Sequence, residues 1–456
     1  MIVEREILSE SVLTPKGWVS PAKITLDSKG YIESVSPLDE SDYHVDLSGP
    51  VLAGMPNLHS HAFQRQMAGL TEVSGQPTDN FWTWREVMYK LANRISPEQL
   101  QSIAAWLQAE MLEAGFTSCG EFHYVHHQPT GMAYDNRSEM SAALVRAADQ
   151  SGISLTLLPV LYCRSGFDSL TVNEGQKRFF NTPETFNLLM SDCRSMLAEY
   201  PQHRLGMAAH SLRAASVEQI QEVIDAQKDE IIPIHIHIAE QTAEVEECQS
   251  TVGARPVDYL LDSFPVDENW CLVHATHLEE NELERAAASG AVAGLCPVTE
   301  ANLGDGFFEA EHWLQNGGSM GVGTDSNIQV SVIDELRLLE YGSRLRNKSR
   351  NVLSSNGQSC GRSLYGHALK GGTAALGHHC GRIEAGFRAD LVELDSSHPF
   401  LQDRKGDQHI DSWIFSGDPS MVRSVWVSGK KVVQESRHIL KSELEKPFRQ
   451  AMKALL

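Results

Sequence analysis

Two histidine pairs, each with one residue between its members, are the first candidates for chemistry. His59 and His61 follow an apolar segment, and His235 and His237 stand among isoleucines in segment 232–238. Residues two apart on an extended chain project from the same face, so both imidazoles of a pair can bind one divalent ion. A single pair of this kind more often consists of packed or solvent-exposed histidines than of metal ligands. The second pair favours a metal site.

The second pair also indicates which of its histidines is the ligand. His237 lies nearer the carboxyl end of its expected strand, and barrels of alternating strands and helices form their active sites at that end. His235, one layer deeper, is expected to be a packed or hydrogen-bonded residue. Glu240, three residues after His237, should lie just above it on the following loop.

Polar side chains end other expected strands in the same way. The residues at these ends are His210 with Arg213, His274, Asp325, and Tyr124 at the end of segment 115–124. Any one of them could be a hydrogen-bonded loop residue. Because packed histidines have no reason to gather at one end of successive strands, their coincidence there predicts a metal-dependent active site.

The donor types predict the ion and its chemistry. Three neutral imidazoles and one carboxylate suit a borderline divalent ion, zinc before iron or manganese. We expect one ion per chain, held by His59, His61, His237 and Asp325. A divalent ion lowers the pKa of a coordinated water from 15.7 toward about 7, and Asp325 can take the proton. Glu240 is placed to pass a proton to a leaving nitrogen, and His274 to hydrogen-bond the attacking water.

The middle of the chain predicts the frame that positions these residues. Over residues 51–375, apolar strand-like runs alternate with amphipathic helical segments, which favours a parallel sheet and an α/β fold of the TIM-like (β/α)8 barrel type. A doubly wound sheet is the alternative, but no Gly-x-Gly-x-x-Gly follows a first strand. The expected strands are 51–58, 115–124, 154–161, 204–209, 231–238, 270–274, 291–296 and 319–323, and the expected helices are 97–114, 139–151, 182–199, 217–228, 279–289 and 332–346.

Both ends of the chain are rich in short strands and turns. Lys29-Gly30, for example, separates two alternating segments as a hairpin turn would. We therefore expect residues 1–50 and 376–456 to form one small β-sandwich domain built from both termini. Residues 441–456 are expected to form a helix that packs on the body.

The composition excludes several classes of protein. Among the 456 residues, 38 Lys and Arg stand against 60 Asp and Glu, so the net charge is −22, which argues against nucleic acid as a partner. No apolar run approaches the ~18 residues of a membrane span, and the start lacks the features of a secretory signal. The eight cysteines are scattered without a Cys-x-x-Cys pair, as reduced thiols of a cytoplasmic protein would be. The expected partner is a small-molecule substrate.

At its candidate site residues the sequence resembles the amidohydrolase superfamily. The motifs His-x-His, His, His-x-x-Glu, His and Asp follow that superfamily's order, which would place them at its first, fifth, sixth, seventh and eighth strand ends. Segment 381–392 is similar to the superfamily's return into its flanking β-sandwich. No lysine stands at the fourth-strand position, and His237 with Glu240 resembles the mononuclear deaminase branch.

The closer resemblance, nearly end to end, is to the formimidoylglutamate deiminase family. It is carried by segments 59–65, 81–85, 210–214, 235–241, 296–306 and 335–342. Residues 299–306, Thr-Glu-Ala-Asn-Leu-Gly-Asp-Gly, are specific within the superfamily, whereas His-x-His is common to all of it. The sequence departs from the family at Gln66 and at 327–329, in the loop after the expected metal-binding aspartate. The roles of His235 and His277 stay open.

The resemblance implies a reaction and the residues that perform it. It implies metal-dependent deamination of N-formimidoyl-L-glutamate to N-formyl-L-glutamate and ammonia, in histidine degradation, by a homodimer with the four ligands named above. The implied catalytic residues are Glu240, His274 and Asp325, and the implied substrate contacts are Gln64, Arg85, Tyr124, His210 and Arg213. Two guanidiniums suit the two carboxylates of a glutamate group. Arg85, beside Trp82 and Trp84, could instead serve only in cation–π packing.

Two other classes of function remain as alternatives. Another mononuclear deaminase or chlorohydrolase, acting on guanine, cytosine, S-adenosylhomocysteine or a triazine, would use the same metal site. Such an enzyme would need apolar stacking walls in place of paired arginines. A catalytically silent scaffold relative is the second alternative, and the presence of all four ligands with Glu240 and His274 argues against it.

Overall fold

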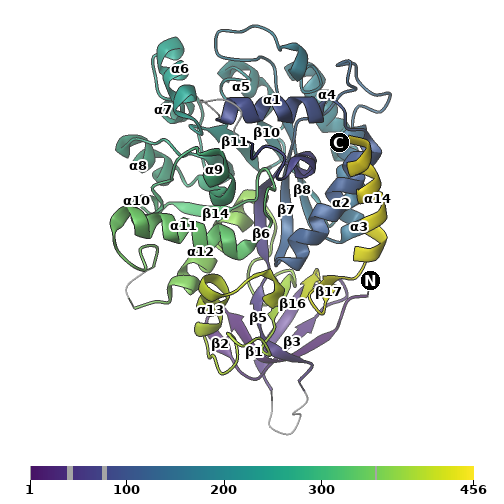
Figure 1. The fold of residues 1–456 in the computed structure, drawn as a ribbon, viewed down its shortest axis with the longest axis vertical. Coiled ribbons are helices and arrows are strands. Elements are labelled where there is room, and N and C mark those ends of the chain that lie inside the picture. Colours follow the sequence, from purple (N-terminus) through teal and green to yellow (C-terminus); the bar gives the residue numbers. More distant parts are fainter. Residues whose placement is uncertain (1, 39–44, 74–79, 355–356, 456) are drawn as a thin grey trace.

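Two sheets organise the chain in the computed structural model, which describes residues 2–38, 45–73, 80–354 and 357–455. One is a parallel barrel surrounded by helices, and the other is a mixed sheet that closes one end of the barrel (Figure 1). The barrel confirms the predicted TIM-like (β/α)8 architecture, and the mixed sheet contains strands from both ends of the chain.

Eight parallel strands form the barrel, and each neighbours the next along the chain. They are β6 (Met55–Ser60), β7 (Phe116–His123), β8 (Ser154–Leu161), β10 (Met207–Ala209), β11 (Ile234–Ile238), β12 (Trp270–His274), β13 (Val292–Leu295) and β14 (Ser319–Val322), with the short β9 (Arg204–Leu205) beside β8. A parallel bridge between Ser60 and Asp325 brings the last strand back to the first. The barrel therefore closes at residues predicted to bind metal.

The strand count corrects the numbering implied by the family resemblance. His210 follows the fourth barrel strand β10, His237 lies in the fifth strand β11, and His274 ends the sixth strand β12. These residues were expected after the fifth, sixth and seventh strands. The count is lower by one because only three barrel strands, β6, β7 and β8, precede the strand of His210.

Side chains cap the first turn of several helices around the barrel. The predicted helices are present as α2 (Pro97–Glu113), α3 (Glu139–Ser151), α4 (Pro183–Leu197), α5 (Val217–Ala226), α8 (Glu280–Ser289) and α11 (Val332–Asn347). At the start of α2, Ser96 accepts a hydrogen bond from the backbone N–H of Gln99, and the Gln99 side chain accepts one from Ser96. Further helices were not predicted: α1 (Phe81–Ala92), α6 (Thr242–Val252), α7 (Pro256–Ser263), α9 (Pro297–Leu303), α10 (Ala310–Gln315), α12 (Cys360–Leu376) and α13 (Gln408–Ser416).

The second sheet is a single mixed sheet of nine strands. Its strands are β1 (Glu6–Thr14), β2 (Gly17–Val19), β3 (Ala22–Leu26), β4 (Ile32–Pro37), β5 (Leu47–Ala53), β15 (Leu391–Leu394), β16 (Val422–Val427), β17 (Lys430–Gln434) and β18 (Arg437–His438). β5 pairs with β1 on one side and β15 on the other, which joins the two ends of the chain. The predicted hairpin at Lys29-Gly30 joins the antiparallel strands β3 and β4. The domain boundaries at 50 and 376 stay predictions.

The last helix, α14 (Lys441–Leu455), packs along α2 at the side of the barrel (Figure 1). The rings of Trp106 and Phe448 stack with their centroids 5.0 Å apart, and Nζ of Lys441 lies 2.7 Å from Oε2 of Glu113. This is the packing expected of a C-terminal helix on the body. Leu456 lies outside the described residues.

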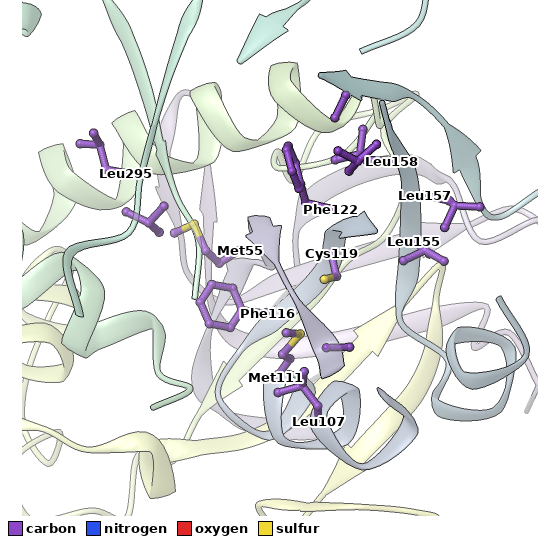
Figure 2. Packing of buried hydrophobic residues seen from close by; sticks show 14 of the residues in the cluster. Met55, Leu107, Met111, Phe116, Cys119, Phe122, Leu155, Leu157, Leu158 and Leu295 are labelled. Atoms are coloured by element: carbon purple, nitrogen blue, oxygen red, sulfur yellow. The ribbon is translucent and has the colours of Figure 1, made fainter. Parts of the chain in front are cut away.

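Buried apolar side chains pack against the barrel strands and the helices around them. Met55, Phe116, Phe122 and Leu295 belong to this cluster, which continues outward to Leu107 on α2 (Figure 2). Each of these side chains is fully buried. Close packing of this kind holds the strands in place, so the polar residues at their ends keep a defined geometry.

A buried ion pair lies just before β15 in the segment that resembles the family's return to its flanking sheet. Arg388 donates to both carboxylate oxygens of Asp390, and its Nη1 donates to Nδ1 of His378 at 3.2 Å. Oδ1 of Asp390 also accepts from the backbone N–H of Ser428 at 2.9 Å. These bonds connect the end of α12 to the mixed sheet.

Each of the eight cysteines, all within the described residues, is buried and outside any disulfide. Among the helices described, none is both long enough and apolar enough to span a bilayer.

Candidate metal-dependent active site

The four predicted metal ligands converge at the carboxyl ends of the barrel strands. Donor atoms of His59, His61, His237 and Asp325 all lie within 4.8 Å of one another, and the four side chains are buried. Nε2 of His59 lies 3.2 Å from Nε2 of His61 and 3.0 Å from Nε2 of His237. Oδ1 of Asp325 lies 3.4 Å and 3.2 Å from the first two nitrogens.

The charge state of these donors fits a divalent cation. Burial lowers the pKa of His59 to about 3 and that of His237 well below its usual value, so both rings are neutral and carry free lone pairs. Burial alone would raise the pKa of Asp325, but hydrogen bonds with His59 and His61 hold it well below its usual value. Three imidazoles around one carboxylate are a typical zinc donor set.

Backbone contacts orient the ligands. Nδ1 of His61 donates to the carbonyl of Phe122 at 2.8 Å, which leaves Nε2 as the lone-pair nitrogen. Two backbone bonds, each 2.9 Å, join Asp325 to the first strand: its carbonyl accepts from His61, and its N–H donates to His59. Gly323 permits this approach, because a Cβ there would lie 2.8 Å from the backbone nitrogen of His59.

The loop after Asp325, where the sequence departs from the family, supports the ligands. The side-chain amide of Asn327 is fully buried and donates to the carbonyl of Asp325 at 2.9 Å and to that of His61 at 3.1 Å. Arg65 donates to the carbonyl of Asn327 at 2.8 Å while it forms a bidentate pair with Glu110. The loop is therefore tied to the first strand and to helix α2.

Beside the donors, His274 lies among three carboxylates. Its Nδ1 is 3.3 Å from Oε1 of Glu300, and its Nε2 is 3.9 Å from Oε1 of Glu240 and from Oδ2 of Asp325. Burial alone would lower the pKa of His274, but Glu240, Glu300 and Asp325 together raise it to about 10. Burial raises the pKa of Glu240, although His274 and Arg213 act in the opposite direction. A raised carboxyl pKa suits a group that both takes and gives protons near neutral pH.

A pocket opens from these residues and contains every side chain expected around the substrate. Its walls include His61, His237, Glu240, His274 and Asp325, and also Gln64, Arg85, Tyr124, His210 and Arg213. The structure therefore brings together all the predicted site residues, except that His59 lies behind the pocket wall among the metal donors. His235, as expected, lies outside this pocket, where its Nε2 is 2.8 Å from the carbonyl of Ala375. His277 bonds through Nε2 to the carbonyl of Asp305 at 2.8 Å.

The two arginines are held differently. Cζ of Arg85 lies 4.3 Å from the centre of the Trp82 ring and 5.5 Å from that of Tyr89. Arg85 thus has the cation–π contact considered from the sequence and lines the pocket as well. Arg213 is 5% exposed, and its Nε lies 3.8 Å from Oε1 of the fully buried Glu244.

Several side chains at the site were not assigned from the sequence. Glu300 contacts His274, Glu244 faces Arg213, and Asn327 supports Asp325. Glu300 lies within the family-specific segment 299–306, which was a usable signal. The apolar walls of the pocket come from Phe81, Trp84, Met88, Tyr89, Tyr162, Phe179 and Leu303. Most of these lie on helix α1, which was not predicted, or on loops.

Comparison with known proteins places the chain among metal-dependent hydrolases. The model of the amidohydrolase family matches residues 51–432. Formimidoylglutamate deiminase of Pseudomonas aeruginosa is 48% identical over 451 residues, which cover 99% of each chain. The crystal structure of an amidohydrolase from Brucella melitensis has 45% identity and a TM-score of 0.94, covering 99% of this chain and 100% of that one.

A more distant structure shares the fold. An adenosine deaminase from Xanthomonas campestris with bound zinc is 20% identical, with a TM-score of 0.81 over 99% of this chain and 98% of that one. The buried donor set, the closed barrel and these similarities agree, and the chain belongs to the amidohydrolase family.

Proposed function

We propose that the protein hydrolyses N-formimidoyl-L-glutamate to N-formyl-L-glutamate and ammonia. The observation that carries the proposal is that two arginines, Arg85 and Arg213, line the same pocket as the buried donor set. A substrate with two carboxylates beside a hydrolysable amidine matches that combination, because guanidiniums bind carboxylates in a bidentate manner. The 48% identity to the Pseudomonas aeruginosa deiminase over nearly the whole chain supports the same substrate.

The proposed ion is zinc, one per chain, held by His59, His61, His237 and Asp325. Its support is the N3O donor set and the zinc bound in the distant adenosine deaminase. Bound there, a divalent ion would acidify a coordinated water and polarise the amidine. Fe²⁺ and Mn²⁺ suit the same donors less well.

The protein's own residues would position the substrate and move the protons. Arg85 and Arg213 would bind the carboxylates, with Gln64, Tyr124 and His210 along the remaining wall. The Cα-bearing nitrogen is then held on the arginine side, and the terminal amidine nitrogen lies toward Glu240. This orientation selects which of the two carbon–nitrogen bonds breaks.

Proton transfer follows from the carboxylates around His274. Asp325 accepts a proton from the attacking water, and Glu240 delivers a proton to the terminal nitrogen, which leaves as ammonia. His274, fixed through Nδ1 by Glu300, donates from Nε2 to the oxygen of the attacking water and stabilises the negative charge that develops there. One water is consumed, one C–N bond breaks, and the formyl oxygen of the product comes from that water.

Product analysis by proton NMR tests the reaction directly. Ammonia with N-formyl-L-glutamate is the expected result, and a formimidoyl amine without carboxylates should react poorly. Glutamate with formamide as the main products would refute the proposed orientation. Guanine, cytosine and S-adenosylhomocysteine are screened beside the proposed substrate, and preferential turnover of any of them would identify another deaminase of this family.

Two smaller predictions belong with this proposal. We propose a cytoplasmic homodimer, which light scattering of the purified protein and fractionation of cells test. A monomer or an exported protein would contradict these two predictions without affecting the reaction.

A further inference from the structure

Glu244, on the first turn of α6, supports the backbone of the proposed proton-transfer residue. Its Oε2 accepts a hydrogen bond from the backbone N–H of Glu240 at 3.1 Å. Ala239, immediately before Glu240, has a φ of 50°, in the left-handed region that alanine rarely adopts. The Glu244 carboxylate therefore helps to stabilise the turn that directs Glu240 into the pocket.

The other oxygen of the same carboxylate faces the proposed substrate-binding arginine. Oε1 of Glu244 lies 3.8 Å from Nε of Arg213, and both atoms are buried without a hydrogen-bond partner. A fully buried carboxylate is costly unless a cation compensates it, and Arg213 is the cation that faces this oxygen. A carboxylate on the Nε side leaves the opposite edge of the guanidinium for a ligand.

We propose that Glu244 is a positioning residue that links Arg213 to Glu240 and so fixes the distance between carboxylate recognition and proton transfer. The inference rests on the proposed function. Its consequence is selection by substrate length: N-formimidoyl-L-aspartate, one methylene shorter, cannot reach Arg213 and Glu240 together while Glu244 holds both.

Two substitutions separate the two contacts of Glu244. Glu244→Gln keeps an oxygen that accepts from Glu240 but removes the charge that faces Arg213. We expect KM for formimidoyl-glutamate to rise about 10-fold, as for loss of a charge-assisted contact, with kcat within about threefold. Glu244→Ala removes both contacts and should also lower kcat about 10-fold. Glu246→Gln, an exposed neighbour on the same helix, is the matched control and should behave as the wild type.

The substrate pair gives a readout that a merely structural role would not change. In Glu244→Gln, the ratio of kcat/KM for the glutamate substrate over the aspartate substrate should fall about 10-fold. A double-mutant cycle tests the link itself: in an Arg213→Ala background, Glu244→Gln should raise KM no further. An unchanged substrate ratio would overturn the proposal. So would an increase in KM in the double variant that equals the product of the increases in the two single variants.

The test remains decisive if a variant folds poorly. Circular dichroism and metal content establish the fold of each variant. If Glu244→Gln fails that check, Arg213→Lys replaces it in the test, because lysine keeps the charge but lacks the Nε donor. The same fall in the substrate ratio is then expected. A ratio equal to that of the wild type would contradict the link. If the wild type itself releases no ammonia from formimidoyl-glutamate, the proposed function fails; if the wild type is active and Glu244→Gln matches Glu246→Gln, only the link fails.

Discussion

Nε2 of His237 lies 3.0 Å from Nε2 of His59, although 178 residues separate the two in sequence. Both imidazoles are buried and neutral, so each ring has one nitrogen that carries a lone pair. With Nε2 as the lone-pair nitrogen of both rings, one divalent cation could bind the two together. The contact therefore brings together, from two distant strands, two of the four donors proposed to hold the ion.

The two histidines of β11 give a matched pair of variants for the metal site. Purified protein should contain about one equivalent of divalent metal per chain. His237→Ala should lose it, whereas His235→Ala should keep it, because His235 bonds to the carbonyl of Ala375 instead. Elemental analysis measures both, and two equivalents in the wild type or retained metal in His237→Ala would contradict a single-ion site.

Glu240→Gln should keep the ion and lose most of the turnover. The substitution preserves shape and removes only the transferable proton, and positioned acid–base groups contribute about 10²–10⁴-fold. Single-turnover rates with metal content measured on the same sample give the answer. A rate near that of the wild type would mean that another group protonates the leaving nitrogen.

Arg213→Ala should lower kcat/KM for formimidoyl-glutamate about 100-fold. Loss of a buried charge-assisted contact removes about 1.5–3 kcal/mol of binding. Activity on a formimidoyl amine without carboxylates should stay at the low level of the wild type, which provides an internal control. Equal losses on both compounds would indicate general damage to the pocket in place of lost carboxylate recognition.

Asn327→Ala should weaken metal binding without removing a ligand. The amide bonds of Asn327 hold the backbone of His61 and Asp325, and loss of such supporting contacts typically costs about 10–100-fold in metal affinity. Competition with a chelator measures the affinity. Gln329→Ala, at an exposed position of the same loop, is the control, and an identical affinity in the two variants would argue against this role for Asn327.

Arg388→Met should lower the free energy of unfolding by about 3–5 kcal/mol, because it leaves Asp390 as an uncompensated buried charge. Urea denaturation of the metal-loaded protein measures the change. The Arg388→Met, Asp390→Leu double variant should recover part of the loss, since it removes both charges. A double variant less stable than the single one would show that the other partners of Asp390, such as Ser428, matter more than the ion pair.

Much of the fold and of the donor set could be predicted from local sequence pattern. Alternation along 232–238 placed both histidines on one face and showed which lies nearer the strand end, as β11 confirms. The expected helix 97–114 matches α2 to within a residue, and Ser96 caps its start. These features depend on the geometry of a short stretch of chain, which has fixed periods of 2 and 3.6 residues.

Contacts between distant segments were decided by the tertiary structure. No local pattern reveals that Glu300 orients His274 or that Glu244 faces Arg213. Helix α1, which carries Arg85, was not among the expected helices.

The barrel explains why the sequence predicts the donor residues but not the distances between them. Each strand carries its own residues to the same rim, so the identity of the donors can be recognised from strand ends alone. Distances and partners at that rim depend on closure between β14 and β6, where Asp325 bonds to His59 and His61. The sequence by itself determined which groups are available for chemistry. Only closure of the barrel decided how far apart they lie, because that distance is set by packing between strands whose order no local pattern contains.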